Sequence, residues 1–126
     1  MSGRRFHSHV GGASTVEFGL TSPLFVLLLF GLVQVAFWIW ASTALQHGAN
    51  AAARCASVNK TICSSQAAIE SYAARHALGL PVSASAFTAA QTTCGNQVSA
   101  TYPYLAFATR LGMPSLAITA RACHPA

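Results

Sequence analysis

One carboxylate stands at the edge of the longest apolar stretch of this chain, and a glycine pair precedes it. Glu17 follows Gly12 by five positions and is followed directly by Phe18. A glycine offers a peptidase an unhindered, extended backbone at the bond to be cut, because it has no Cβ. Cleavage after Gly12 would expose the amine of Ala13, about 6 Å along a helix axis from the Glu17 carboxylate. These residues can therefore support proteolytic processing and an ion pair.

We expect that ion pair to join two molecules. Within one helix the new amine and Glu17 pair imperfectly, whereas the terminus of an adjacent, axially shifted subunit can pair well. In lipid neither charge keeps its hydration, so the attraction is far stronger than in water. Such a pair would hold the register between neighbouring helices during assembly. The alternative is that Glu17 lies in the headgroup zone with its charge solvated.

The stretch after Glu17 has the length of a membrane-spanning helix. From Phe18 to Trp40 all but three of the 23 side chains are apolar. At the rise of an α-helix the segment reaches roughly 34 Å, and a hydrocarbon core is about 30 Å thick. Trp38 and Trp40 fit the aromatic belt of a membrane interface. The sequence therefore predicts one span at about residues 18–40.

The number and placement of charged residues limit the kinds of partner that the chain can bind. The 126 residues include seven Lys and Arg and two acidic residues, for a formal net charge of +5. Arg4 and Arg5 precede the span, and the other cations are scattered singly behind it: Arg54, Lys60, Arg75, Arg110 and Arg121. No basic stripe interleaved with aromatic residues forms, so we expect no nucleic-acid binding. Positive charge ahead of the span orients the N-terminus toward the cytoplasm, and the C-terminal part is then exported.

The N-terminal segment resembles a type IV prepilin signal, and most closely that of the TadE-like pseudopilins of the tight-adherence (Tad, type IVc) pilus. A short basic leader ends in Gly11-Gly12 and is followed by Ala13-Ser14-Thr15-Val16-Glu17-Phe18. The family pattern of Arg-Arg, small residues, Val-Glu-Phe and a Leu-rich span reads here as residues 4–5, 11–15, 16–18 and 23–30. The Ala-, Gln- and Arg-rich helical stretch that follows in the family is similar to residues 44–54. The resemblance covers roughly residues 4–58.

This resemblance implies a minor pilin or pseudopilin that takes part in assembly of a tight-adherence pilus. A prepilin peptidase would cleave after Gly12, between Gly12 and Ala13, and Glu17 and Phe18 would serve assembly and recognition. The implied partners are the major pilin and other minor pilins, the prepilin peptidase, the inner-membrane assembly platform and the lipid bilayer. The implied location is the bacterial inner membrane with the C-terminal domain on the periplasmic side, and later the pilus or cell surface.

Two other interpretations of the N-terminal half stay open. The chain can be a generic single-span membrane protein whose small exported domain is an accessory subunit of another envelope complex. The first 40 residues can also be a secretory signal peptide cut near Ala41 or Ala44. Against removal, the apolar run is about twice the usual length of such a region, and the helical pattern continues to Arg54.

Pro23 lies inside the predicted span. A proline has no N–H, so the Gly19 carbonyl loses its hydrogen bond and the helix is expected to kink. The hydroxyls of Thr21 and Ser22 can satisfy the freed backbone groups. Local weakening here would ease extraction of the helix into a filament; a tolerated membrane proline is the alternative.

Beyond the span the pattern predicts an α+β fold with pilin-like architecture. We divide the chain into a leader (1–12), a long helix (13–57) and a small exported domain (58–126), with the helix continuous from about Ser14 to Ala56. A second helix follows an N-cap at Ser64 or Ser65 and closes at Gly79 and Pro81. Its predicted apolar face comprises Ile69, Tyr72, Ala73, His76, Ala77 and Leu80, with His76 a packed histidine rather than a ligand.

The C-terminal third predicts a short antiparallel sheet. Residues 82–96, rich in Ser, Ala and Thr, are expected to form a loop with little local order. Alternation over residues 97–104 predicts a half-buried strand, and residues 116–122 its partner. Pro103, Gly112 and Pro114 bound a wide connection between the two strands.

Four cysteines predict two disulfides. An even count in a small exported domain suggests full pairing, with three connectivities available. We expect Cys55 with Cys63 across the turn between the helices, and Cys94 with Cys123 near the open end of the hairpin. Strict alternation places Cys94 and Cys123 on opposite faces of the sheet, so this pair requires a bulge or a break, at Gly95.

Catalysis and metal binding find little support. Glu70 is the one acidic residue after the span, and no paired carboxylates or Ser, His and Asp set accompany it. A zinc site made of cysteines and His124 lacks any Cys-x-x-Cys spacing. We therefore expect a non-enzymatic assembly protein without a cofactor or metal.

Overall fold

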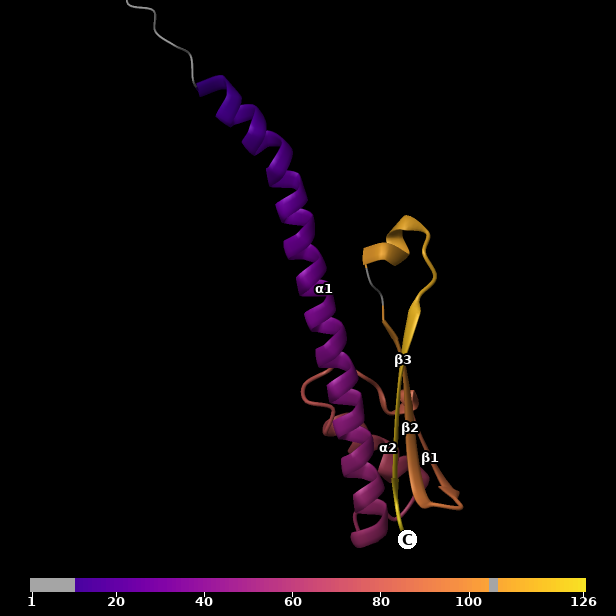
Figure 1. The fold of residues 1–126 in the computed structure, drawn as a ribbon. Helices are drawn as coiled ribbons and strands as arrows, with labels where there is room; N and C mark the ends of the chain where they lie inside the picture. The colour runs from indigo at the N-terminus through magenta and orange to yellow at the C-terminus, as the bar shows by residue number, and fades with distance from the viewer. Residues whose placement is uncertain (1–10, 105–106) are drawn as a thin grey trace, which may run out of the picture. The chain divides into compact units, whose positions relative to one another are not determined.

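The computed structural model describes residues 11–104 and 107–126 and has an α+β architecture (Figure 1). The elements are α1 (Gly11–Val58), α2 (Gln66–Arg75), the 3-10 helix η1 (Ala84–Ala86), β1 (Phe87–Thr92), β2 (Gly95–Tyr104), the 3-10 helix η2 (Phe107–Leu111) and β3 (Leu116–His124). The chain divides into two units, residues 1–35 and 36–126. The predicted fold class is confirmed, whereas most of the predicted leader, with Arg4 and Arg5, lies outside the described residues.

Helix α1 has two different surroundings along its 48 residues. Every large apolar side chain from Val16 to Trp40 is exposed, with exposed fractions between 41% and 74%. From Ala41 onward the helix buries one side instead, through Ala41, Ala44, Leu45, Ala49, Ala52, Ala53 and Ala56. By length and composition α1 can cross a membrane. One helix therefore combines an apolar, uncovered half with a half that packs in the second unit.

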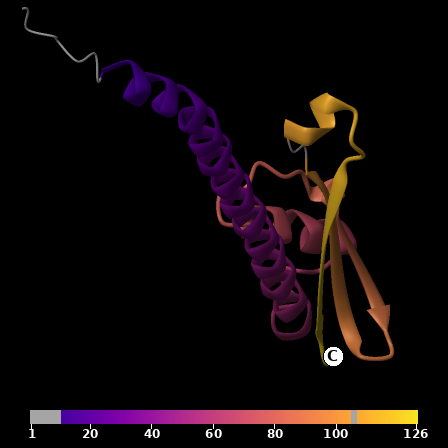
Figure 2. The ribbon, with the colours of Figure 1, turned by 45° about the horizontal axis from the view of Figure 1, so that its top comes forward.

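Pro23 lies within α1 and does not end it. The helix curves over its N-terminal turns, as a proline that removes one backbone hydrogen bond allows (Figure 2). The Thr21 hydroxyl donates to the Glu17 carbonyl at 2.9 Å rather than to the Gly19 carbonyl. A threonine in a helix reaches the carbonyl three or four residues earlier, and Gly19 lies too close to Thr21 in sequence.

The sheet is antiparallel with strand order β1-β2-β3. Its register aligns Phe87 with Ala100 and Ala100 with Ala120 across the three strands. Ala89, Val98 and Ala122 form the next buried row on the same face. The wide connection between β2 and β3 is present as predicted and contains η2.

Strand β1 corrects our expectation that residues 82–96 form a loop. Phe87 and Ala89 are buried and Thr88 and Ala90 exposed, so the alternation of a half-buried strand is present. Small Ala and Thr side chains give that alternation little contrast in sequence. Pairing with β2 and burial of Phe87 stabilise the strand, and both are tertiary effects that local composition does not reveal.

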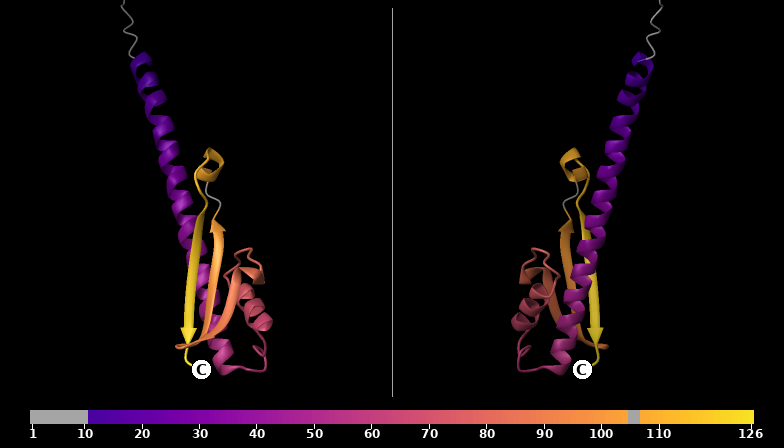
Figure 3. Two further views of the ribbon diagram at one scale, coloured as in Figure 1. Left: turned by 90° about the vertical axis from the view of Figure 1, so that its right-hand side faces the viewer. Right: turned by 90° about the vertical axis from the view of Figure 1, so that its left-hand side faces the viewer.

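The second half of α1 and the helix α2 lie on the same face of the sheet (Figure 3). At Gly48 the helix α1 comes close to both α2 and β1. A Cβ built on Gly48 would lie 2.6 Å from the Ala73 carbonyl oxygen and 3.3 Å from Cζ of Phe87. Glycine at this position therefore allows the close contact between α1 and α2 without a shift of either helix.

Helix α2 begins as predicted, since the Ser65 hydroxyl accepts the Ala68 N–H at 3.3 Å. His76 corrects a prediction, because it is exposed rather than part of the apolar face. The helix ends at Arg75, so residue 76 leaves the helical repeat that would have turned it inward. Its ring lies 4.2 Å from the Tyr72 ring, and its carbonyl accepts a hydrogen bond from Nδ1 of His47 at 2.9 Å.

Candidate processing and assembly site

The four predicted site residues at the N-terminal end lie together in the first two turns of α1. Gly12, Ala13, Glu17 and Phe18 are all helical and exposed. No atom lies within 4 Å of the position that a Cβ on Gly12 would occupy. The segment is therefore open to a protein that approaches from the side.

The backbone at the predicted cleavage point differs from our expectation of an extended chain. Helix α1 already begins at Gly11, so the bond between Gly12 and Ala13 lies in its first turn. The first N–H groups of a helix have no partner within the helix, and such a turn opens at low cost. Cleavage here would require local unwinding, which an exposed first turn permits.

The Glu17 carboxylate has no partner within the described part of the chain. No hydrogen bond or ion pair to another residue of 11–104 or 107–126 involves its oxygens, although the backbone carbonyl of Glu17 accepts from Thr21. It is one of two acidic residues in the sequence and lies beside Phe18, whose side chain is 72% exposed. A charge placed against so much uncovered apolar surface gains most from a cation brought by another molecule.

Beyond the carboxylate, α1 offers a surface that can pack against another helix. Gly19 and Gly31 have open space at the position of a Cβ, and Leu20 and Leu24 expose 74% and 70% of their side chains. A membrane or neighbouring helices would bury this surface.

The structure pairs Cys55 with Cys63 and Cys94 with Cys123, the pairs expected from the sequence. Cys55 and Cys63 are buried, with exposed fractions of 8% and 5%, and link the end of α1 to the connection that follows. With all four cysteines in disulfides, no thiolate is left to bind zinc. No group of three or more His, Cys, Asp or Glu suited to a metal occurs among the residues that the structure describes.

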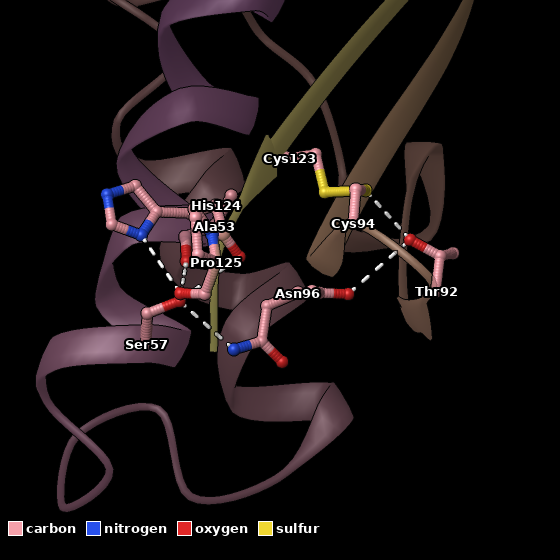
Figure 4. Close-up of a disulfide and its surroundings, with 9 residues drawn as sticks. Ala53, Ser57, Thr92, Cys94, Asn96, Cys123, His124 and Pro125 are labelled. Carbon is pink, nitrogen blue, oxygen red and sulfur yellow. Dashed lines mark hydrogen bonds between the residues drawn. A yellow bond between two sulfur atoms is a disulfide. The ribbon is translucent and has the colours of Figure 1, made fainter.

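The second disulfide links the β1–β2 turn to β3 (Figure 4). Cys94 lies in the turn, outside both strands, so strand alternation does not govern its direction. Gly95, where we expected a bulge or a break, begins β2 directly after the turn and has φ of +119°. A Cβ on Gly95 would collide with the His124 carbonyl and lie 2.8 Å from Cα of Pro125, so only glycine fits.

Polar contacts that the sequence did not suggest fix α1 to the sheet. The Gln46 amide donates to the Arg121 carbonyl at 2.8 Å, on β3. The Asn96 amide donates to the Ser57 hydroxyl at 3.1 Å (Figure 4). Such long-range side-chain contacts have no local sequence signal, because each depends on how two distant segments pack.

Glu70, the other acidic residue, has a structural role in the described chain. Its Oε1 accepts the Ala89 backbone N–H of β1 at 3.3 Å and the Gln66 amide at 3.1 Å. The carboxylate satisfies a backbone donor on an edge strand, which would otherwise lack a partner in the sheet. Of the two carboxylates, only Glu17 is thus left without a partner among the described residues.

Comparison with known proteins yields one family. The family described as TadE-like protein matches residues 12–54. The matched segment contains Gly12, Ala13, Glu17 and Phe18 and extends along α1 to Arg54, which confirms the resemblance inferred from the sequence. No curated protein and no solved structure matches the chain.

Proposed function

We propose, from the premise that residues 12–54 are TadE-like, that this chain is a minor pilin or pseudopilin taking part in assembly of a tight-adherence pilus. The observation that carries the proposal is the Glu17 carboxylate, exposed and without a partner in the described chain, one turn beyond the Gly12–Ala13 bond. The role is structural rather than catalytic.

The first step is processing by a prepilin peptidase. The peptidase would unwind the exposed first turn of α1 and cut after Gly12, leaving the amine of Ala13 as the new N-terminus. An exposed glycine with open space around it supports access to this bond. Glu17 becomes the fifth residue of the mature chain.

The second step pairs subunits. The Ala13 amine and the Glu17 carboxylate are about 6 Å apart along the axis of one helix, so a neighbour displaced along the axis by that amount brings its amine level with Glu17. Exclusion of water by the surrounding apolar side chains, Phe18 among them, makes the pair strong and an unpaired charge costly. Only one axial register satisfies both charges.

The third part of the proposal is the location of the protein in the cell. The uncovered half of α1 would cross the inner membrane, with residues 41–126 on the periplasmic side before incorporation into the pilus at the cell surface. Both disulfides fit a domain that folds in an oxidising compartment. The major pilin, other minor pilins, the assembly platform and the bilayer are the proposed partners.

Intact-mass measurement of the mature protein tests the processing step. In cells that contain the peptidase we expect a chain that starts at Ala13, and Gly12→Val should abolish this shortening because a branched side chain hinders the bond. Gly19→Ala, also in open space on α1, is the matched control and should be processed normally. A chain that retains its first residues in such cells would instead support a generic single-span accessory subunit of another envelope complex.

A further inference from the structure

The connection between β2 and β3 and the first residue of β3 carry apolar side chains that are exposed in the described structure. Leu111, Met113 and Leu116 are 71%, 60% and 62% exposed. Outside α1 they are three of the five large apolar side chains exposed among the residues whose side chains the structure describes. A cluster of this kind on a small domain usually marks an interaction surface. We name residues 109–116 the apolar loop.

The backbone of the apolar loop is a defined turn. The Gly112 N–H donates to the Thr109 carbonyl at 3.2 Å, and Gly112 has φ of +84°, a conformation that favours glycine. Leu111, at the end of η2, and Met113 lie directly before and after Gly112. Two exposed apolar side chains are therefore held next to Gly112, where the chain makes a hydrogen-bonded turn.

The charge of the apolar loop suits an anionic surface. Arg110 is exposed and adjacent to Leu111. No Asp or Glu occurs between Glu70 and the last residue of the sequence, so the loop carries no opposing charge of its own. An arginine beside exposed leucine and methionine matches the boundary between lipid phosphates and acyl chains.

The position of the apolar loop within residues 36–126 also favours a lipid surface as its partner. The loop projects from the end of this unit at which α1 enters, whereas the end of α1 and the β1–β2 turn lie at the opposite end (Figures 1 and 3). The entering part of α1 exposes Phe37, Trp38 and Ile39 by 54%, 45% and 53%. Two apolar surfaces that are distant in sequence thus occur at one end of the unit.

We propose that the apolar loop inserts into the interface of the bilayer that α1 spans, with Leu111, Met113 and Leu116 among the acyl chains and Arg110 at the phosphates. This inference rests on the proposed membrane span. The exposed apolar side chains of the loop and of entering α1 form one end of the unit, so a single lipid surface covers both. The loop then gives the domain a second attachment beside α1 and fixes how it faces the membrane.

Depth-dependent quenching tests the proposal in the full-length protein. Ser115→Cys, labelled with the fluorophore NBD without reduction of the disulfides, reports on the apolar loop; Thr61→Cys, after the end of α1, is the control. Both are placed singly in nanodiscs of phosphatidylcholine and phosphatidylglycerol that contain lipids with a shallow nitroxide. We expect quenching at residue 115 about twofold or more above that at residue 61, because an inserted loop meets the nitroxide directly.

Matched variants separate insertion from general folding. The double substitution Leu111→Asp and Met113→Asp should reduce quenching at residue 115 to the level at residue 61. Val58→Asp should leave it unchanged, although Val58 and Leu111 have the same exposed fraction of 71%. Equal loss of quenching in Val58→Asp would overturn the proposal, because the effect would then not be specific to the loop.

The two tryptophans, Trp38 and Trp40, report on the span independently. If the nitroxide lipid quenches their emission but the residue 115 label is quenched no more than the residue 61 label, the loop inference is wrong and the span stands. If the tryptophans are not quenched either, the span itself fails, and the loop inference with it. A blue-shifted label at residue 115 without lipid quenching would indicate a protein contact and would also overturn the proposal.

Discussion

Replacement of Gly48 by alanine tests how the second half of α1 packs on α2 and β1 within residues 36–126. The added Cβ would lie 2.6 Å from the Ala73 carbonyl oxygen, which is closer than real Cβ atoms come to backbone. The oxygen belongs to the backbone of α2, so it cannot turn aside as a flexible side chain would. Helix α2 or α1 must shift instead, and Phe87, 3.3 Å from the same Cβ, limits the shift.

Two opposing terms set the size of the effect. Alanine favours the helix by about 1 kcal/mol relative to glycine. Overpacking a close contact costs about 1–3 kcal/mol. The free energy of unfolding should therefore fall by about 1 kcal/mol, which lowers the melting temperature by about 4–8 °C for a domain of this size.

Thermal unfolding of the full-length protein in detergent, followed by near-ultraviolet circular dichroism, measures this change. Gly31→Ala is the matched control, since it adds the same methyl group to α1 where no atom lies within 4 Å, and it should not lower the melting temperature. A Gly48→Ala protein that melts at or above the wild-type temperature would refute the close approach of α1 to α2.

Three further predictions concern the carboxylates and the exposed disulfide. Glu17→Ala should leave membrane insertion and cleavage largely intact but lower recovery in sheared pili, and equal recovery of variant and wild type would contradict the register role. Mild reductant should open the exposed Cys94–Cys123 bond before the buried pair at the end of α1, as differential alkylation and mass spectrometry would detect; simultaneous opening would contradict the difference in exposure. Glu70→Ala should cost about 1–3 kcal/mol, because the Ala89 N–H loses its acceptor, and should speed hydrogen exchange at that amide; unchanged exchange would mean that the contact is not formed in solution.

The features predictable from the sequence are those with a local physical cause. An uncharged run ending in two tryptophans specifies a long apolar helix, and Ser65 specifies the start of α2. The two cysteine pairs followed from an even count and from the order of the elements, and Gly95 indicated where the chain changes direction beside Cys94.

The features that the sequence left hidden depend on distant contacts. Strand β1 is formed by pairing with β2, and its alternating Ala and Thr side chains are nearly equal in size. His76 had the spacing of a buried position but lies just past the end of α2. At the candidate site, the sequence identified Glu17 and Gly12. Only the structure showed that the Glu17 carboxylate has no partner among the described residues and that the Gly12–Ala13 bond lies within a helix.

The domain core has a composition that ties its folding to cysteine oxidation. Alanine supplies eleven of the sixteen buried residues in the core cluster, and the largest fully buried side chains are Phe87, Leu45 and Val98. Alanine side chains let the helices pack closely on the sheet, but each buries little apolar area. The two disulfides therefore supply stability that a core of larger side chains would otherwise provide. We therefore expect the domain to be only marginally stable while its thiols are reduced and to gain much of its stability as the two bonds form.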